Sequence, residues 1–190
     1  MFKISIKLLL ILSIQLFHPL LAADESPEET ARQASEIMEK RCMVCHGCYD
    51  APCQLKMEAF DGIQRGASKE LVYQTSRLSA AETTRLFDDA HTEEQWRKKG
   101  FYPVLDAKNP KQGIMYQMLQ LKQAHPLASE GPPPEGFDFS LNRDQQCPKP
   151  EEFAEFRREF PLWGMPYGLP GLSTGEHEAM TRWLEQGGQR

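Results

Sequence analysis

A chain of 190 residues with 40% hydrophobic residues is long enough to form one domain with a core of its own. Its net charge of −5, without any run of basic residues, does not suit nucleic acid, and we expect no nucleic-acid partner. The same charge gives no attraction to anionic lipid, so contact with a membrane would have to use apolar or aromatic surface.

The chain begins with the pattern of a secretory signal peptide, MFKISIKLLLILSIQLFHPLLAADES. Lys3 and Lys7 form a basic start, LLLIL the apolar centre, and Ala22-Ala23 a small-residue exit. We expect a signal peptide over residues 1–23, cleaved near Ala23. The alternative is an uncleaved anchor, although polar residues and a proline interrupt the apolar run.

Export would place the mature domain, residues 24–190, in the periplasm. Losing the two lysines and no acidic residue would take the charge from −5 to −7. Within this domain the helix signals are clear and no segment alternates convincingly as a strand would. We therefore predict a mainly α fold with long irregular loops.

The first predicted helix begins at Ser26, since Ser26-Pro27-Glu28-Glu29 combines an N-cap serine, a proline at the first helical position and a glutamate that completes a capping box. Its apolar stripe consists of Ala31, Ala34, Ile37 and Met38, and it leads directly to Cys42. The end of this helix is therefore expected to set the position of Cys42.

Similar signals predict helices over about 92–100, 109–126 and 151–160. The last helix has a second capping box, Ser173 with Glu176, and an apolar face of Met180, Trp183 and Leu184. Between residues 126 and 150 a segment rich in proline and glycine predicts an irregular, exposed loop.

Four of the five cysteines lie in RCMVCHGCYDAPC, residues 41–53. Cys42-Met43-Val44-Cys45-His46 is the C-x-x-C-H pattern of covalent haem attachment. Two thiols one helical turn apart can each form a thioether with a haem vinyl group, and the next residue, His46, can then reach the iron. We predict a c-type haem held by Cys42, Cys45 and His46.

Other cysteine chemistry fits less well. Cys42, Cys45, Cys48 and Cys53 nearly match an iron–sulfur spacing, but the last gap is one residue too long and Gln54 replaces the proline. A zinc site usually needs a second pair of ligands, and none follows. Cys48, Cys53 and Cys147 remain, and an oxidising compartment favours one disulfide among them, either Cys48–Cys53 or Cys53–Cys147.

A haem bound by His46 needs a second axial ligand or an open face. Met165 lies in the irregular stretch PLWGMPYGLPGLS, whereas Met115 and Met118 have helical spacing and are expected in the core. We predict Met165 as the second ligand, and Met/His ligation would raise the reduction potential of the iron. The competing interpretation is that Met165 is a buried packing residue.

In outline the order of parts resembles a class I cytochrome c, and the choice of Met165 rests mainly on that likeness. A closer likeness lies in four phrases, RCMVCHGCYDAPCQLK, RGASKELVY, WRKKGFYPVL and PLWGMPYGLPGLS. They resemble the N-terminal part of the cis/trans isomerases of unsaturated fatty acids, periplasmic haem proteins of Gram-negative bacteria, from about Arg41 to Leu184. Members of that family are several times longer, so we expect a haem-bearing head that lacks a C-terminal isomerase portion.

The resemblance implies an isomerase that converts cis to trans double bonds in the acyl chains of membrane phospholipids. The alternatives are an electron-transfer cytochrome c with a redox partner, and an inactive haem-bearing fragment of a longer isomerase. No acid–base pair or nucleophile stands out, so the catalytic residues stay unidentified. Arg65, Arg77 and Arg85 are expected to be solvated surface charges.

Overall fold

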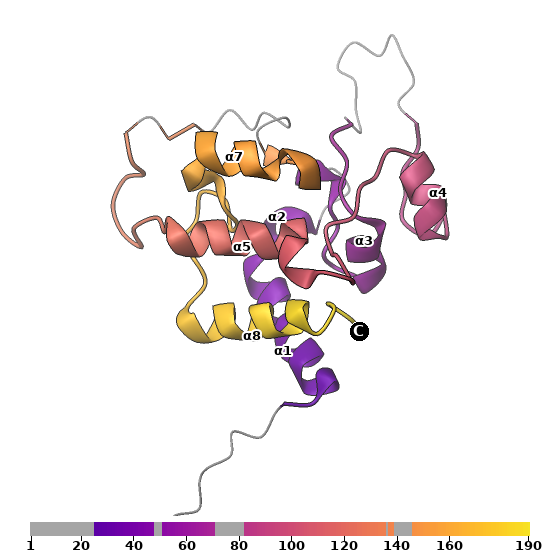
Figure 1. Cartoon of the computed structure of the whole chain (residues 1–190), viewed down its shortest axis with the longest axis horizontal. Coiled ribbons are helices and arrows are strands. Elements are labelled where there is room, and N and C mark those ends of the chain that lie inside the picture. The colour runs from indigo at the N-terminus through magenta and orange to yellow at the C-terminus, as the bar shows by residue number, and fades with distance from the viewer. Residues whose placement is uncertain (1–24, 48–50, 71–81, 136, 139–145) are drawn as a thin grey trace, which may run out of the picture.

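The computed structural model describes residues 25–47, 51–70, 82–135, 137–138 and 146–190 (Figure 1). The predicted signal peptide, Cys48 and Arg77 lie outside these residues. None of the helices within them has both the length and the apolar character needed to cross a bilayer.

The described residues form a mainly α structure, as predicted. Their β contacts amount to one isolated bridge between Ala67 and Tyr102. Short 3₁₀ turns precede or separate several helices, most of them started by a proline. The helices are α1 (Pro27–Arg41), α2 (Met43–His46), α3 (Phe60–Arg65), α4 (Glu93–Lys98), α5 (Ile114–Ala124), α7 (Phe153–Glu159) and α8 (Thr174–Glu185), and the 3₁₀ turns are η1 (Pro52–Gln54), η2 (Pro110–Gln112), η3 (Pro150–Glu152) and η4 (Pro161–Trp163).

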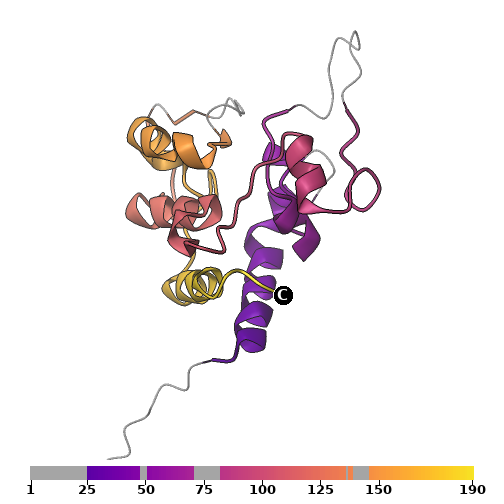
Figure 2. The same ribbon diagram turned by 45° about the vertical axis from the view of Figure 1, so that its right-hand side comes forward.

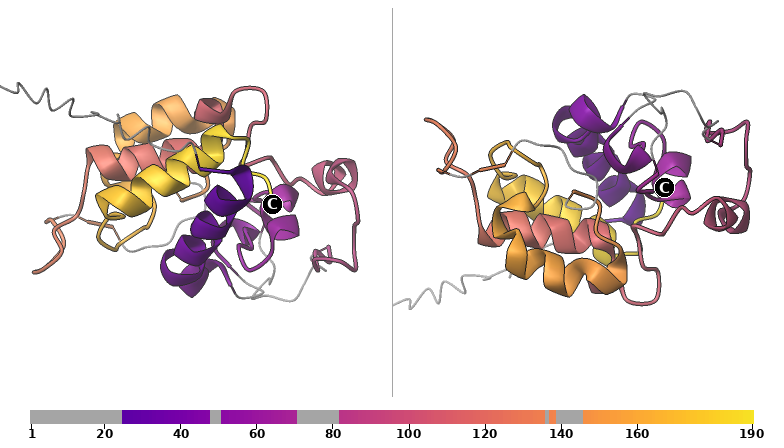
Figure 3. Two further views of the ribbon diagram at one scale, coloured as in Figure 1. Left: turned by 90° about the horizontal axis from the view of Figure 1, so that it is seen from below. Right: turned by 90° about the horizontal axis from the view of Figure 1, so that it is seen from above.

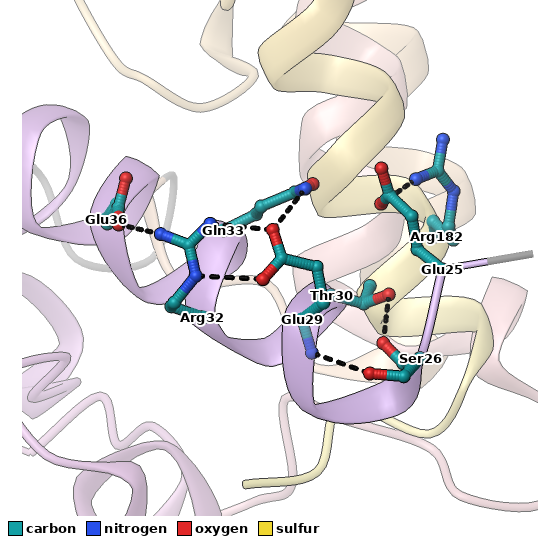
Figure 4. Close-up of polar contacts among 8 residues, drawn as sticks. All are labelled: Glu25, Ser26, Glu29, Thr30, Arg32, Gln33, Glu36 and Arg182. Carbon is teal, nitrogen blue, oxygen red and sulfur yellow. Dashed lines mark hydrogen bonds and ion pairs between the residues drawn. The ribbon is translucent and has the colours of Figure 1, made fainter. Parts of the chain in front are cut away.

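The start of α1 shows how local sequence sets a helix end, with one difference from the prediction (Figure 4). The Ser26 hydroxyl accepts a hydrogen bond from the Glu29 backbone N–H at 3.3 Å, as an N-cap does. The Glu29 carboxylate does not return to Ser26 but accepts hydrogen bonds from Arg32 and Gln33. The predicted capping box is therefore half formed in α1, whereas both halves are present in α4 and α8.

Helix α8 runs across α1, and the main core lies around their contact (Figures 1 and 2). Ala34 and Met38 from α1 belong to the same buried cluster as Met180, Trp183 and Leu184 from α8. Both apolar faces are the ones that the helical spacing predicts. At the N-terminal end of α1, Glu25 forms an ion pair with Arg182 of α8 (Figure 4).

The molecule has two sides. Figure 2 shows α7, α5 and α8 stacked on one side and α1 to α4 on the other. Beyond α8 the C-terminal residues turn back to the second side, where Arg190 pairs with Asp61 of α3 (Figure 3). The Arg190 guanidinium also lies 5.5 Å from the centre of the Phe60 ring.

A disulfide joins the two sides. Cys53, in η1, is bonded to Cys147, 94 residues later, with 5.6 Å between their Cα atoms. Of the two pairings that the sequence allowed, this structure has the longer one. It also corrects the prediction of an exposed loop up to residue 150, because Gln146, Cys147 and Pro148 are buried.

We predict that replacing Cys147 by alanine lowers the free energy of unfolding by about 2–4 kcal/mol, because the cross-link restricts the unfolded chain over a long loop. Urea denaturation of the oxidised protein measures this change. Cys48→Ala is the matched control and should leave the unfolding midpoint in place. Equal destabilisation by both variants would contradict the Cys53–Cys147 pairing.

Candidate functional site

A cavity of about 250 Å³ lies between the two sides of the molecule. All four residues predicted to hold the cofactor line it: Cys42, Cys45, His46 and Met165. The sequence placed the first three together by spacing alone, but Met165 comes from more than a hundred residues further along. The fold is what brings its side chain to the same cavity.

The thiols are held at the junction of α1 and α2. Cys42 caps the C-terminus of α1, and its carbonyl accepts hydrogen bonds from the backbone N–H of Cys45 at 3.1 Å and of His46 at 2.9 Å. Neither thiol is in a disulfide. Burial raises the pKa of the Cys42 thiol to about 11, whereas Cys45 is exposed. Both sulfurs are therefore available for covalent attachment.

His46 is buried with one ring nitrogen already in use. Its Nδ1 lies 3.0 Å from the Leu55 carbonyl oxygen, which can only accept, so Nδ1 carries the proton and the lone pair is on Nε2. Burial lowers the pKa of His46, and the hydrogen bond to Leu55 partly opposes that shift. A neutral imidazole oriented by a backbone carbonyl is the arrangement typical of metal-ligating histidines.

The walls of the cavity are apolar. Met115, Met118 and Leu119 of α5 form one wall, and Met180 of α8 closes it from another direction. Arg41, at the end of α1, is the one charged residue among the described residues that line the cavity. A planar apolar cofactor with few polar groups suits such a lining better than a polar substrate does.

Two contacts with α5 fix the loop that carries Met165. The Met165 backbone N–H donates to the Met118 carbonyl at 3.1 Å. Gly164 lies so close to α5 that a Cβ there would be 2.3 Å from the backbone nitrogen of Lys122, which makes glycine necessary. Met165 is half-buried, lines the cavity and also packs against the second core cluster. The packing role of Met165 is therefore confirmed, and its role as a ligand stays a prediction.

An aromatic row supports this loop from behind. Tyr167 lies against Trp163 with 4.8 Å between ring centroids, and Trp163 against Phe160 with 5.6 Å. The row continues through Phe156 to Phe153 in α7. The Met165 loop therefore packs against a continuous row of rings.

Arg65 corrects a prediction, because it is buried rather than solvated. It is 2% exposed and donates to the Thr84 carbonyl at 2.8 Å and to the Gln54 carbonyl. Its guanidinium lies 4.8 Å from the centre of the Phe101 ring and 5.3 Å from that of Trp96. Arg65 thus ties α3 and α4 together and is not directed to the cavity.

The other metal interpretations lose support from the same geometry. A four-cysteine cluster would need Cys53, which is used in the disulfide. Within the described ranges no three His, Cys, Asp or Glu side chains gather as a metal site would require. One histidine with two adjacent thiols and a distant thioether is the donor set of a covalently attached haem with two axial ligands.

Three residues near the site were not found from the sequence. Arg41 borders the cavity, and the buried side-chain nitrogens of Gln146 and Lys122 have no hydrogen-bond partner within the described part of the chain. Gln146 lines the cavity, and Lys122 lies beneath the Met165 loop. Only their surroundings in the fold distinguish them from ordinary surface residues, so no local pattern could have found them.

A model of the family described as fatty acid cis/trans isomerase matches residues 81–190. The match covers α4, α5, the Met165 loop and α8, and it begins after the C-x-x-C-H segment. No curated protein matches the chain. No solved structure matches it either.

We expect Lys122→Met to raise the free energy of unfolding at pH 7 by about 1–3 kcal/mol, because it removes an unpaired buried ammonium. Burial lowers the pKa of Lys122 to about 8, from 10.5 in the unfolded chain. Between these values the unfolded state binds the Lys122 proton and the folded state does not, so the destabilising effect of Lys122 should disappear as the pH rises from about 8 to 10.5.

Urea denaturation across this pH range tests the prediction for Lys122. The stability advantage of the variant over the wild type should shrink across that window, because the other titrating groups, such as the Cys42 thiol, contribute equally to both proteins. Lys98→Met, at an exposed position of α4, is the control and should follow the wild-type profile. A difference between Lys122→Met and wild type that stays constant from about pH 8 to 10.5 would contradict the prediction.

Proposed function

This chain belongs to the fatty acid cis/trans isomerase family, and we propose that it is a periplasmic c-type haem protein that converts cis double bonds in phospholipid acyl chains to trans. The observation that carries the haem proposal is the convergence of Cys42, Cys45, His46 and Met165 on one apolar cavity. The family match supports the reaction class, and the periplasmic location rests on the signal-peptide pattern.

Each residue has a defined role in this proposal. Cys42 and Cys45 would form thioethers with the haem vinyl groups, and His46 would offer Nε2 to the iron because its Nδ1 is bonded to the Leu55 carbonyl. Met165 would offer its thioether from another wall of the cavity. The apolar walls exclude water, which strengthens any interaction with charge that develops inside.

Isomerisation requires rotation about the C=C bond of the alkene, and this rotation needs the π bond to be weakened temporarily. Bound ferric haem would supply an acceptor for electron density or for one electron, which returns to the alkene afterwards. No net oxidation or reduction occurs, so no external reductant is needed. The chain would hold the haem through Cys42, Cys45, His46 and Met165, and its apolar walls would keep water out of the site.

Two exposed apolar residues near the cavity support contact with acyl chains. Val44, between the two thiols, is 72% exposed, and Leu169, which lines the cavity, is 43% exposed. An acidic protein has little attraction to anionic headgroups, so such apolar surface is the contact that remains available. The exposed edge around Cys45 would equally suit electron transfer to a redox partner, which is the second candidate function.

We predict that Cys42→Ala/Cys45→Ala prevents covalent haem attachment, since both thioethers are lost. In the attached protein, Met165→Leu should remove the long-wavelength absorption band of a methionine–ferric iron bond. Met115→Leu, which changes a methionine of the same cavity on α5, should keep the band. Haem staining after denaturing electrophoresis and visible spectra provide the measurements. Retention of the band in Met165→Leu would refute the ligand assignment.

The function itself is tested with vesicles of cis-unsaturated phospholipid incubated with the haem-attached protein. We expect trans fatty acids in the extracted lipid, and none with the Cys42→Ala/Cys45→Ala variant. Trans product formed by that variant would exclude a role for haem. A normal haem spectrum without trans product would instead favour the electron carrier.

A further inference from the structure

The proposed ligation raises the question of which contacts hold Met165 in place. An iron bound by both His46 and Met165 has no open position, so the hold of the protein on Met165 decides whether small molecules or an alkene can approach the metal. The loop of residues 164–171 carries Met165, and four of its members line the cavity: Met165, Pro166, Tyr167 and Leu169. The contacts that hold the two ends of this loop therefore determine whether a small molecule or an alkene can reach the iron.

The first end of the loop is fastened to α5. The Met165 N–H donates to the Met118 carbonyl at 3.1 Å, and Gly164 packs directly against the backbone of Lys122. These are backbone contacts on a packed helix that is itself part of the buried core. We expect this end to stay in place when side chains elsewhere are changed.

Near the second end, a side chain from the opposite side of the molecule contacts the loop. The loop is also held there by the Tyr167 hydroxyl, which donates to the Asp138 carbonyl, and by Leu172, which is buried. The Arg41 guanidinium donates through Nη2 to the Gly171 carbonyl at 2.9 Å and to the Pro170 carbonyl at 3.4 Å. Gly168, Leu169 and Pro170 are exposed, so burial does little to hold them. Arg41 is the residue immediately before the C-x-x-C-H segment, and it also lines the cavity.

We propose that Arg41 is a positioning residue that latches the Met165 loop over the cavity, and that the strength of this latch sets how readily Met165 leaves the iron. The inference rests on the proposed haem ligation. One residue thereby links the segment that attaches the cofactor to the segment that closes its other face. The carbonyl contacts form the latch, because the ion pair of Arg41 with Glu176 is long, at 3.9 Å.

The test compares Arg41→Met with Arg32→Met in the haem-attached, reduced protein. Methionine keeps the apolar stem that borders the cavity and removes the guanidinium. Arg32 lies on the same helix and, among the residues that the structure describes, pairs with Glu29 and Glu36 of that helix, which makes it a matched control. Carbon monoxide binding should be about tenfold faster in Arg41→Met and unchanged in Arg32→Met, because binding scales with the fraction of molecules in which Met165 is off the iron.

Two further variants separate the latch from a general loss of structure. Arg41→Lys, which can still donate to one carbonyl, should recover part of the wild-type rate. Glu176→Gln keeps a residue able to complete the capping box of α8, removes only the ion pair and should leave the rate near wild type. A rate increase of the same size in Glu176→Gln as in Arg41→Met would show that the ion pair, not the carbonyl contacts, holds the loop.

Hydrogen exchange supplies a readout that does not depend on haem. Backbone amides of the half-buried residues Tyr167 and Gly171 should exchange about tenfold faster in Arg41→Met than in Arg32→Met, with unchanged exchange in α5 and α8. Equal exchange in both variants, or unchanged carbon monoxide binding with the methionine–iron band intact, would overturn the latch. A wild-type protein that lacks that band and binds carbon monoxide rapidly would overturn Met165 ligation, and with it the control of access by Arg41.

Discussion

The geometry of the cavity depends on the packing of α8 across α1. Helix α1 ends at the residue before Cys42, and α8 begins a few residues after Met165, so each helix positions one face of the site. Met38, Met180 and Trp183, buried where the helices meet, fix the distance between those faces. Because interiors are close-packed, a shift of either helix would be transmitted to the residues at its end.

The two faces of the cavity differ in the contacts that hold their residues in place. Cys42, Cys45 and His46 lie within five residues on one helical junction, so their relative positions are set by local backbone hydrogen bonds. Met165 depends on contacts that are distant in sequence: a carbonyl of α5, an aromatic row that leads to α7 and a guanidinium from α1. The face built from local contacts is the more constrained of the two, and the face built from distant contacts is the one that a single side chain can loosen.

The sequence predicted what is decided locally. The cap of α1, the capping boxes of α4 and α8, the apolar stripes and the C-x-x-C-H spacing were all visible, because each involves residues within one or two helical turns. The roles of Arg65 and Arg41 were not visible, and the partner of Cys53 stayed open between Cys48 and Cys147. In each case the contact is with a carbonyl, a ring or a thiol that is 11 to 130 residues away. Helix α3 was missed because its six residues carry no side-chain cap.

The Cys53–Cys147 disulfide has a consequence for how the protein is made. Within one short segment, Cys42 and Cys45 stay out of disulfides while Cys53 forms one. Until Cys147 arrives, 94 residues later, every cysteine near Cys53 is a wrong partner, and short loops close more easily than long ones. With the proposed haem attachment, maturation would therefore involve a kinetic competition between mispairing and attachment. The order of these events, and not only the final energy, would decide how much correctly assembled protein is obtained.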